Sequence, residues 1–155
     1  MAGTITIRND DLRGPEIAEL LQAHLAHCRL WSPPESVHAL DLEALRAPSI
    51  TFWTAWDGTS LLGCGALAEI DAAHGEVKSM HTAAQHRGRG VAARLLTHML
   101  AQARTRRYGR VSLETGSHEA FAPARALYAR FRFIECAPFA GYRPDPHSMF
   151  MTLEL

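Results

Sequence analysis

A glycine-rich segment contains the residues of this chain whose types and spacing best suit the binding of an anion. It reads Gln85-His86-Arg87-Gly88-Arg89-Gly90-Val91-Ala92 and lies between a strand-like run and a long helical pattern. Glycines permit a tight turn that brings several backbone N–H groups close to a ligand, and the start of a helix adds partial positive charge. Arg87 and Arg89 add formal charge at the same place. The segment therefore predicts a binding site for a pyrophosphate.

The same segment also fits a strand-to-helix turn that binds nothing, because two glycines at this spacing are a weak signal. A Walker-type phosphate loop is excluded, since no Lys-Ser/Thr pair follows Gly90. A dinucleotide-binding fold is disfavoured, since hairpins precede the segment in place of a parallel β-α-β start. The rest of the chain has to decide between these interpretations.

Hydrophobic periodicity predicts the elements that position this segment. Apolar runs and alternation predict strands over residues 4–8, 50–56, 61–70, 76–82, 110–115, 133–137 and 148–155. Apolar residues at helical spacing predict helices over residues 15–28, 35–45, 90–107 and 119–131. Strands followed by strand-helix-strand units indicate an α/β (α+β mixed) fold in which helices pack on one mixed sheet.

The composition indicates one compact domain over residues 1–155 and limits its partners. Sixteen basic and sixteen acidic residues give a net charge of zero, which argues against a nucleic-acid or membrane-surface partner. The charge is uneven, however: residues 77–113 carry eight bases and no acid, whereas residues 1–76 have a net charge of −7. The basic stretch contains the glycine-rich segment and the helix that follows it, so we expect a local polyanion site there.

The cysteines and histidines give no sign of a disulfide framework or a metal site. Cys28, Cys64 and Cys136 are odd in number and lack Cys-x-x-Cys spacing, as expected of small core residues in a reducing compartment. His24 and His27 share one helix face, but no second ligand cluster accompanies them, so we expect no metal. Residues 1–11 have no signal-peptide character and no run reaches the ~20 apolar residues of a membrane helix, which predicts a cytoplasmic protein.

Two segments together resemble the GCN5-related N-acetyltransferase (GNAT) superfamily, of the bacterial small-molecule type. Gln85-x-x-Gly88-x-Gly90-x-Ala92 is similar to the family's acetyl-CoA motif. Residues 124–133, Ala-Arg-Ala-Leu-Tyr-Ala-Arg-Phe-Arg-Phe, are similar to its Ala-x-x-Leu-Tyr-x-x-x-Gly-Phe signature, with Arg132 in place of the usual glycine. The resemblance implies a GNAT-like, mostly antiparallel sheet of about seven strands flanked by about four helices. It also implies acetyl-CoA (coenzyme A) as acyl donor, without a metal.

The resemblance further implies which residues bind the donor and perform catalysis. The cofactor-binding set that we expect is Met80, His81, Thr82, Gln85, His86, Arg87, Gly88, Arg89, Gly90, Val91, Ala92 and Arg125. Glu76 would accept the proton of the amine, directly or through water, and Tyr128 would protonate the departing thiolate. Strand surface is the alternative for Glu76, and a core aromatic is the alternative for Tyr128. Strand alternation places His81 on the opposite face from Glu76 unless a bulge intervenes.

The acceptor site is predicted from the segments that should border the cleft. We expect it to contain Trp31, Glu35, His38, Glu114, Thr115, Phe139, Tyr142 and Arg143. Acidic charge favours an amine, while Arg143, if it points inward, would bind a carboxylate, so the two features agree for an amino acid. The predicted function is acetyl-CoA-dependent N-acetylation of a small amine or amino-acid-like acceptor by direct attack on the thioester. A catalytically silent acyl-CoA sensor and a protein (lysine or N-terminal) acetyltransferase remain alternatives, and a homodimer stays open.

Overall fold

A seven-stranded sheet forms the centre of the molecule. The computed structural model describes residues 4–155, so residues 1–3 of the expected domain lie outside the described residues. The strand order is β1-β2-β3-β4-β5-β7-β6, and every neighbouring pair is antiparallel except β4 and β5. The strands are β1 Thr6–Asn9, β2 Ile50–Asp57, β3 Ser60–Asp71, β4 His74–Thr82, β5 Arg110–Gly116, β6 Ile134–Glu135 and β7 Ser148–Glu154. The predicted mixed, mostly antiparallel sheet is confirmed.

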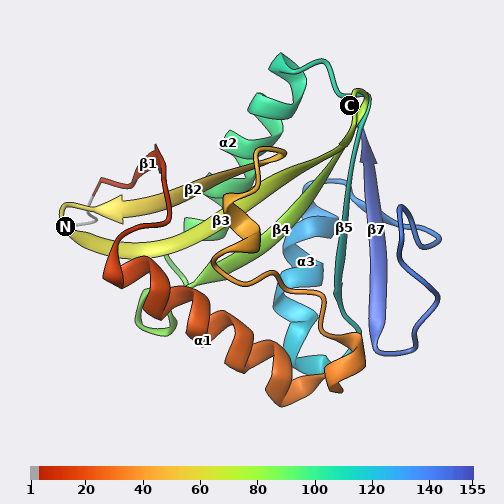
Figure 1. Ribbon diagram of the computed structural model, residues 1–155, viewed down its shortest axis with the longest axis horizontal. Coiled ribbons are helices and arrows are strands. Elements are labelled where there is room, and N and C mark those ends of the chain that lie inside the picture. The colour runs from red at the N-terminus through yellow and green to blue at the C-terminus, as the bar shows by residue number, and fades with distance from the viewer. Residues whose placement is uncertain (1–3) are drawn as a thin grey trace.

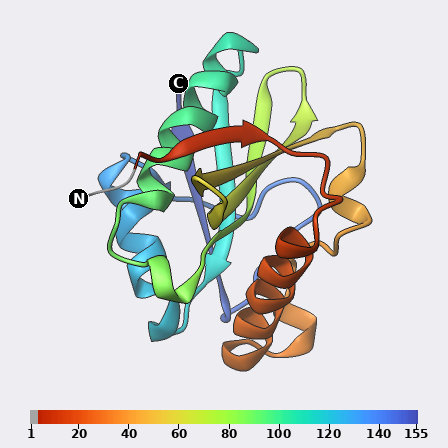
Figure 2. The same cartoon turned by 90° about the vertical axis from the view of Figure 1, so that its left-hand side faces the viewer.

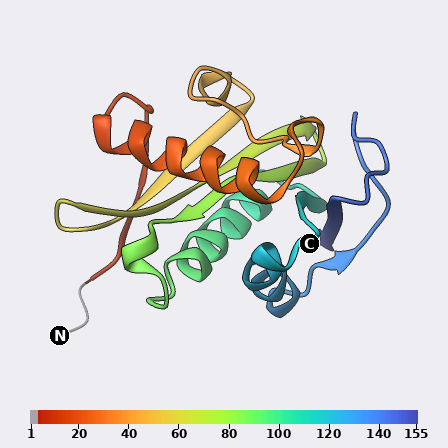
Figure 3. The same cartoon turned by 90° about the horizontal axis from the view of Figure 1, so that it is seen from below.

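Three α-helices cover the two faces of this sheet, as Figures 1 and 3 show. Helix α1 (Pro15–Trp31) lies on one face, and α2 (Val91–Thr105) and α3 (Ala122–Arg130) lie on the other. Each face has its own buried cluster. The larger cluster, under α2 and α3, includes Trp53, Leu67, Val77, Leu95, Met99, Leu113, Tyr128 and Met151. The smaller cluster, under α1, includes Ile17, Leu21, Leu45, Phe52, Cys64 and Ala66.

The helix expected over residues 35–45 is wrong, and residues 4–155 contain three α-helices together with four 3-10 turns. Two 3-10 turns stand there instead, Pro34–Ser36 and Ala44–Arg46, separated by irregular backbone. The Asp41 side chain accepts a hydrogen bond from the Ala44 backbone N–H at 2.8 Å, which offers the backbone a local alternative to a helix. A segment of this length also nucleates a helix poorly. The apolar spacing in this segment therefore reflects packing of a loop, with Leu45 buried.

Strands β4 and β5 pair only at their beginnings. Their parallel register runs from His74 opposite Arg110 to Val77 opposite Leu113, although both strands continue further. Beyond these residues the two strands separate, which is visible in Figure 1. The backbone groups of the separated halves have no partner across the gap, because each strand hydrogen-bonds only to its other neighbour there. The sheet therefore opens in its middle, between the two covering layers.

A β-bulge in β4 changes which side chains share a face. The register of β4 on β3 pairs Ala66 with Lys78 but Cys64 with His81, so one extra residue lies between them. Ser79 within the bulge has a φ of 55°. Since side chains directly opposite in a pair lie on the same face, Lys78 and His81 both lie on the face of α1. The bulge therefore places His81 on the same face of the sheet as Glu76, whereas strict alternation would have placed it on the opposite face.

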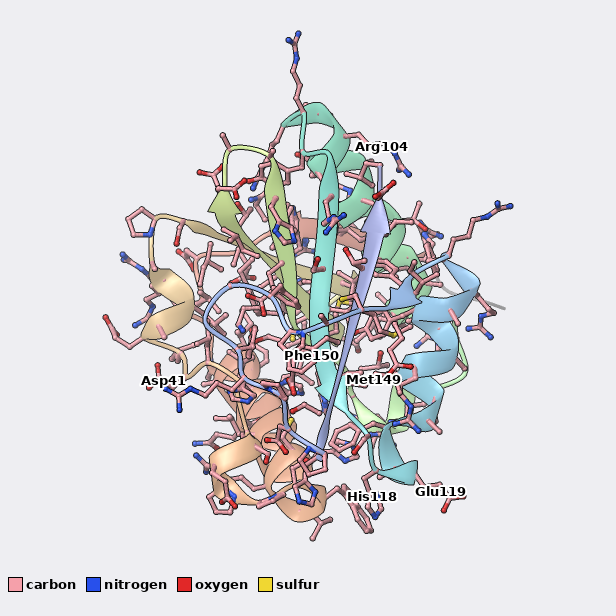
Figure 4. The ribbon with its side chains drawn as sticks, turned by 90° about the vertical axis from the view of Figure 1, so that its right-hand side faces the viewer. Asp41, Arg104, His118, Glu119, Met149 and Phe150 are labelled. Carbon is pink, nitrogen blue, oxygen red and sulfur yellow. The ribbon has the colours of Figure 1, made fainter. Side chains whose placement is uncertain are left out.

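The basic stretch is divided between the two ends of α2. The glycine-rich loop with Arg87 and Arg89 lies at its N-terminal end, drawn in light green in Figure 2. Arg104 lies in the last turn of the helix and Arg106 and Arg107 follow it, about 22 Å from the loop for 15 residues of helix. Figure 4 shows Arg104 at one extremity of the molecule and His118 and Glu119 at the other. Only the first part of this charge can act on a ligand of the loop.

Candidate active site

A cavity of about 470 Å³ occupies the gap between β4 and β5. Its walls come from both faces of the sheet. From the side of α1 it is lined by His24, His27, Cys28, Ser36, His38, Glu76, Lys78, His81, Glu114 and Tyr142. From the side of α2 and α3 it is lined by Val91, Ala92, Ala93, Phe121, Ala124, Leu127, Tyr128 and Arg130. The cavity therefore passes through the sheet, at the place where the strands stop pairing.

The glycine-rich loop forms one end of this cavity through its backbone. Gly88 and Gly90 have φ angles of 80° and 77°, and an added Cβ atom would meet nothing within 4 Å at either position. Glycine is thus favoured at both positions by conformation and not by lack of space. Gly90 is the N-cap of α2 and supplies no side-chain cap, so the first N–H groups of the helix are free of a capping side chain. Such a helix start is suited to an anion.

The cofactor-binding residues expected from the sequence divide into two groups. Those that line the cavity are Met80, His81, Thr82, Arg87, Gly88, Gly90, Val91 and Ala92. Those outside the lining are Gln85, His86, Arg89 and Arg125. Arg89 forms an ion pair with Asp57 at 2.9 Å, and Arg125 donates to the carbonyls of Gly116 and His118 at 2.7 and 2.9 Å. These two guanidinium groups hold loops together in this structure.

A charged network closes the cavity on the side of α1. The Tyr142 hydroxyl donates to Glu76 Oε2 at 2.5 Å, and Lys78 Nζ lies 3.1 Å from the same oxygen and 2.9 Å from the hydroxyl. The side chains of Glu76 and Lys78 are only 10% and 11% exposed. Burial, followed by the charge of Glu76, raises the pKa of Tyr142, so this hydroxyl stays a proton donor to the carboxylate. Lys78 was not predicted, although alternation from Glu76 places it on the same face.

A second cavity of about 470 Å³ adjoins the first at this network. The two cavities share His38, Glu76 and Tyr142, and the second also contains Glu35, Arg143 and Asp145. Ser36 Oγ donates to Asp145 Oδ2 at 2.5 Å, which joins the loop after α1 to the loop before β7. The predicted acceptor residues Glu35, His38, Tyr142 and Arg143 are thus brought together.

Four other predicted acceptor residues have different surroundings. Glu114 and Thr115 line the first cavity. Trp31 lies outside both linings and stacks on His118, with ring centroids 4.8 Å apart. Phe139 also lies outside them and packs edge-on against Tyr142 and Phe150, with centroids 5.1 and 6.0 Å away. Phe139 therefore packs against Tyr142, which lines both cavities, and does not line either cavity itself.

Tyr128 reaches the cavity from α3. It is 6% exposed, belongs to the larger core cluster and packs edge-on against Phe133 at 5.8 Å between ring centroids. Burial, followed by the negative charge of Glu114, raises its pKa, so the phenol holds its proton at neutral pH. The two interpretations of this residue, core aromatic and proton donor, are compatible because one ring edge packs while the residue also lines the cavity.

Two histidines that face each other form part of the wall under α1. His24 Nδ1 lies 3.2 Å from His81 Nδ1. Burial lowers the pKa of His24 to about 3 and that of His81 to about 4, so both imidazoles are neutral at neutral pH. Cys28 Sγ lies 4.0 Å from His24 Nε2, and burial raises the pKa of this thiol to about 11. No group of three His, Cys, Asp or Glu side chains suited to a metal ion is found within residues 4–155.

Ser79, in the β4 bulge, also lines the cavity and was not predicted from the sequence. Its Oγ is buried and has no hydrogen-bond partner among the described residues. The bulge left no signal in the sequence, because neither a glycine nor a proline marks it.

Within residues 4–155, no helix has both the length and the apolar character needed to cross a membrane.

The strands β4 and β5 thus separate beside a glycine-rich helix start, and a cavity lies between them. The chain belongs to the acetyltransferase (GNAT) family, whose profile matches residues 15–133. It is 54% identical to the uncharacterized N-acetyltransferase YsnE of Bacillus subtilis, over 96% of this chain and 99% of that protein. It is 47% identical to the uncharacterized N-acetyltransferase YedL of Escherichia coli, over 97% and 94%. The predicted family and the predicted enzyme class are confirmed.

A third relative and two solved structures extend this comparison. The IAA acetyltransferase of Azospirillum brasilense is 39% identical, over 79% of this chain and 80% of that protein. An acyl-CoA N-acyltransferase of Klebsiella pneumoniae superposes with a TM-score of 0.80 at 28% identity, covering 98% of both chains. A GNAT family acetyltransferase of Elizabethkingia anophelis, solved with acetyl-CoA bound, has a TM-score of 0.70 at 20% identity, covering 97% of this chain and 98% of that one.

Proposed function

We propose that this protein transfers the acetyl group of acetyl-CoA to the amine of a small molecule or amino-acid-like acceptor. The observation that carries the proposal is a cavity with a backbone anion site at one end and an ionic, hydrogen-bonded network at the other. An acyl carrier and an amine can enter such a cavity from opposite faces of the sheet. Holding two reactants in line in this way removes much of the entropic cost of their reaction.

The donor would be held largely by backbone groups. The free N–H groups at the start of α2 suit its pyrophosphate, with Arg87 adding charge from the cavity wall. The unpaired half of β4, from Lys78 to Thr82, offers hydrogen-bonding groups of an extended backbone to the amide-containing arm. A bound thioester would place its acyl carbon in the gap between the strands.

Tyr128 would supply the proton that the departing thiolate needs. Its raised pKa keeps the phenol protonated, and its position on α3 lies on the face from which the donor enters. A neutral amine attacks the acyl carbon, the bond to sulfur breaks, and the phenol donates to the sulfur. The proton that the amine loses requires a carboxylate on the opposite face, where Glu76 and Glu114 both line the cavity.

The charges of the acceptor end support an amino-acid-like substrate. Four acids line the two cavities there: Glu35, Glu76, Glu114 and Asp145. Two bases, Lys78 and Arg143, line them as well. The excess of acid favours an ammonium group, and a base within the same chamber can bind a carboxylate. An α-amino acid carries both groups.

The test is a screen of amines, amino acids and the IAA after which one relative is named, with acetyl-CoA as donor and release of the CoA thiol as readout. We expect release with one chemical class of small acceptor and none without an acceptor. Binding of acetyl-CoA without release for any compound, peptides included, would favour the silent sensor. Release with lysine-containing or N-terminal peptides alone would favour a protein acetyltransferase.

A further inference from the structure

We infer that Glu114 on β5 is the group that accepts the proton of the attacking amine, and that Glu76 is a positioning residue. This inference rests on the proposed acetyl transfer and assigns one of its steps. It differs from the expectation drawn from the sequence, which gives the proton to Glu76. The contacts of the two carboxylates, their places relative to the gap and the groups around them support the assignment.

The carboxylate of Glu76 already has hydrogen-bond and ion-pair partners within the protein. One of its oxygens, Oε2, accepts from the Tyr142 hydroxyl and from Lys78 Nζ, and Lys78 also donates to that hydroxyl. The residue is 7% exposed, and the ammonium group of Lys78 neutralises its charge. A carboxylate in a buried ion pair loses part of that pairing when it takes a proton, so it is a poor acceptor. Its contacts suit it to orient Lys78 and Tyr142.

Glu114 stands at the opening itself. It is the first residue of β5 after the last pair with β4, Val77 opposite Leu113. Its register partner on β7 is Phe150, which packs against Tyr142 with ring centroids 5.5 Å apart, so Glu114 lies on the acceptor side of the sheet. Figure 4 shows Met149 and Phe150 diverging to the two sides of β7. Glu114 thus faces an incoming amine from across the gap.

The carboxylate of Glu114 keeps capacity for a proton. Among residues 4–155, Ser148 is the hydrogen-bond partner of its side chain, with Oγ donating to Oε2 at 2.8 Å. No basic side chain of these residues lies within ion-pair distance of it. One carboxylate oxygen is therefore left for the substrate, in contrast to the neutralised charge of Glu76.

The groups around Glu114 come from every layer that packs near it. They are Glu76 and Lys78 on β4, His38 in the loop after α1, Cys28 on α1, Tyr128 on α3 and Ser148 on β7. Burial raises the pKa of Glu114, the charge of Glu76 raises it further, and Ser148, His38 and Lys78 act in the opposite direction. A carboxylate with a raised pKa is a stronger base at neutral pH. Its activity as a base is lost as the pH falls through that pKa.

The proposed step balances in bonds and protons. The nitrogen of a neutral amine forms a bond to the acyl carbon while the carbon–sulfur bond breaks, and the electron pair of that bond stays on sulfur. The nitrogen gives one proton to the carboxylate of Glu114, and Tyr128 gives one proton to the sulfur. Glu114 then releases its proton to solvent and Tyr128 takes one back, so the enzyme returns to its starting state. The products are the N-acetylated acceptor and CoA as a thiol.

The experiment compares the acidic limb of the kcat/KM profile in two variants that each remove one hydrogen-bond donor. The substrates are acetyl-CoA and the acceptor with the fastest CoA release in the screen. Ser148→Ala takes a donor from Glu114, so we expect its limb to move to higher pH by about one unit. Tyr142→Phe takes a donor from Glu76, and we expect its limb to stay in place whatever happens to the rate. Titration of the amine itself is the same in both variants, so it cannot produce this difference.

Two substitutions complete the test. Glu114→Gln should lower kcat by about 10²-fold and remove from the acidic limb the ionisation that Ser148→Ala moves, so that only the titration of the amine is left. Glu76→Gln should retain that ionisation and act mainly on the KM of the acceptor. A limb that moves with Tyr142→Phe and not with Ser148→Ala, or a limb that is unchanged in Glu114→Gln, would overturn the assignment. Should a variant lose activity, ¹³C NMR titration of glutamate-labelled protein, with Glu114→Gln giving the assignment, measures the shift caused by Ser148→Ala directly. If the wild-type protein releases no CoA with any acceptor, the proposed function fails, and the NMR titration still reports on Glu114.

Discussion

The two ends of the cavity are built in different ways. The end that we propose for the donor is made by a continuous stretch of backbone, in which Gly88 and Gly90 set the turn and the start of α2 supplies N–H groups. The end that we propose for the acceptor is made by side chains from distant parts of the chain, with Glu76, Lys78 and Tyr142 joined by hydrogen bonds. A backbone site tolerates side-chain changes around it, whereas a coupled side-chain site does not. Substitutions should therefore act locally at the first end and cooperatively at the second.

The largest effect is expected from Tyr128, which lines the cavity from α3. Tyr128→Phe removes the hydroxyl and keeps the packing against Phe133, so kcat should fall by about 10³-fold while the affinity for acetyl-CoA is unchanged. Steady-state kinetics and calorimetric titration with acetyl-CoA measure the two quantities. A kcat within threefold of wild type would show that the phenol is only a core residue.

Lys78→Met should expose the coupling of the acceptor end. It leaves the buried carboxylate of Glu76 without its cation, so the free energy of unfolding should fall by about 3 kcal/mol in urea denaturation. The double variant Glu76→Gln/Lys78→Met removes both charges and should recover most of this loss. Additive effects of the two substitutions would contradict a coupled network.

Acid should weaken the wall formed by His24 and His81. Burial lowers the pKa of His24 from its ordinary value of 6.5 to about 3. Between these two pH values the imidazole is protonated in the unfolded chain and neutral in the folded one, so the unfolded chain binds more protons. The stabilisation from the neutral imidazole is complete above about pH 6.5 and declines as the pH falls, by about 2 kcal/mol at pH 5. Urea denaturation at pH 7 and pH 5 measures it. His24→Gln should lose less stability over this interval than the wild-type protein, and an equal loss would contradict the role of His24.

The smallest effect is expected at the donor end, and the chain contains its own control. Gly90→Val forces a branched side chain into a positive φ, which costs about 1–2 kcal/mol of stability and should weaken acetyl-CoA binding about tenfold. Gly58→Val introduces a comparable strain in the β2–β3 hairpin, where φ is 58° and the space is equally open. It should lose similar stability and keep its affinity. Equal affinities of the two variants for acetyl-CoA would show that the glycine-rich loop is not part of the binding site.

Sequence predicted those parts of the structure that depend on local pattern. The strands, the three long helices and the glycine-rich loop follow from alternation, helical spacing and the φ angles that only glycine adopts readily. Glu76 and Tyr128 were predicted through their motif positions, and the structure brings both to one cavity. Their catalytic roles stay predictions.

What sequence did not predict depends on contacts between distant segments. Arg89 pairs with Asp57 and Arg125 donates to the carbonyls of Gly116 and His118, and neither arginine lines the cavity, although their positions beside the motifs favoured binding. Lys78 gains its importance from Tyr142, which is 64 residues away. The bulge at Ser79 follows from register between strands and has no local signature. In each case a contact between distant segments determines where the side chain lies, and such a contact leaves no local pattern in the sequence.

The early end of pairing between β4 and β5 also has a kinetic consequence. The cavity is lined from both faces of the sheet, so under the proposed transfer the donor would approach from one face and the acceptor from the other. Neither reactant has to wait behind the other, and both must be present before transfer occurs. CoA should then compete with acetyl-CoA for one face and leave the other open to the amine. The gap in the sheet would thus keep the approach of the donor separate from that of the acceptor.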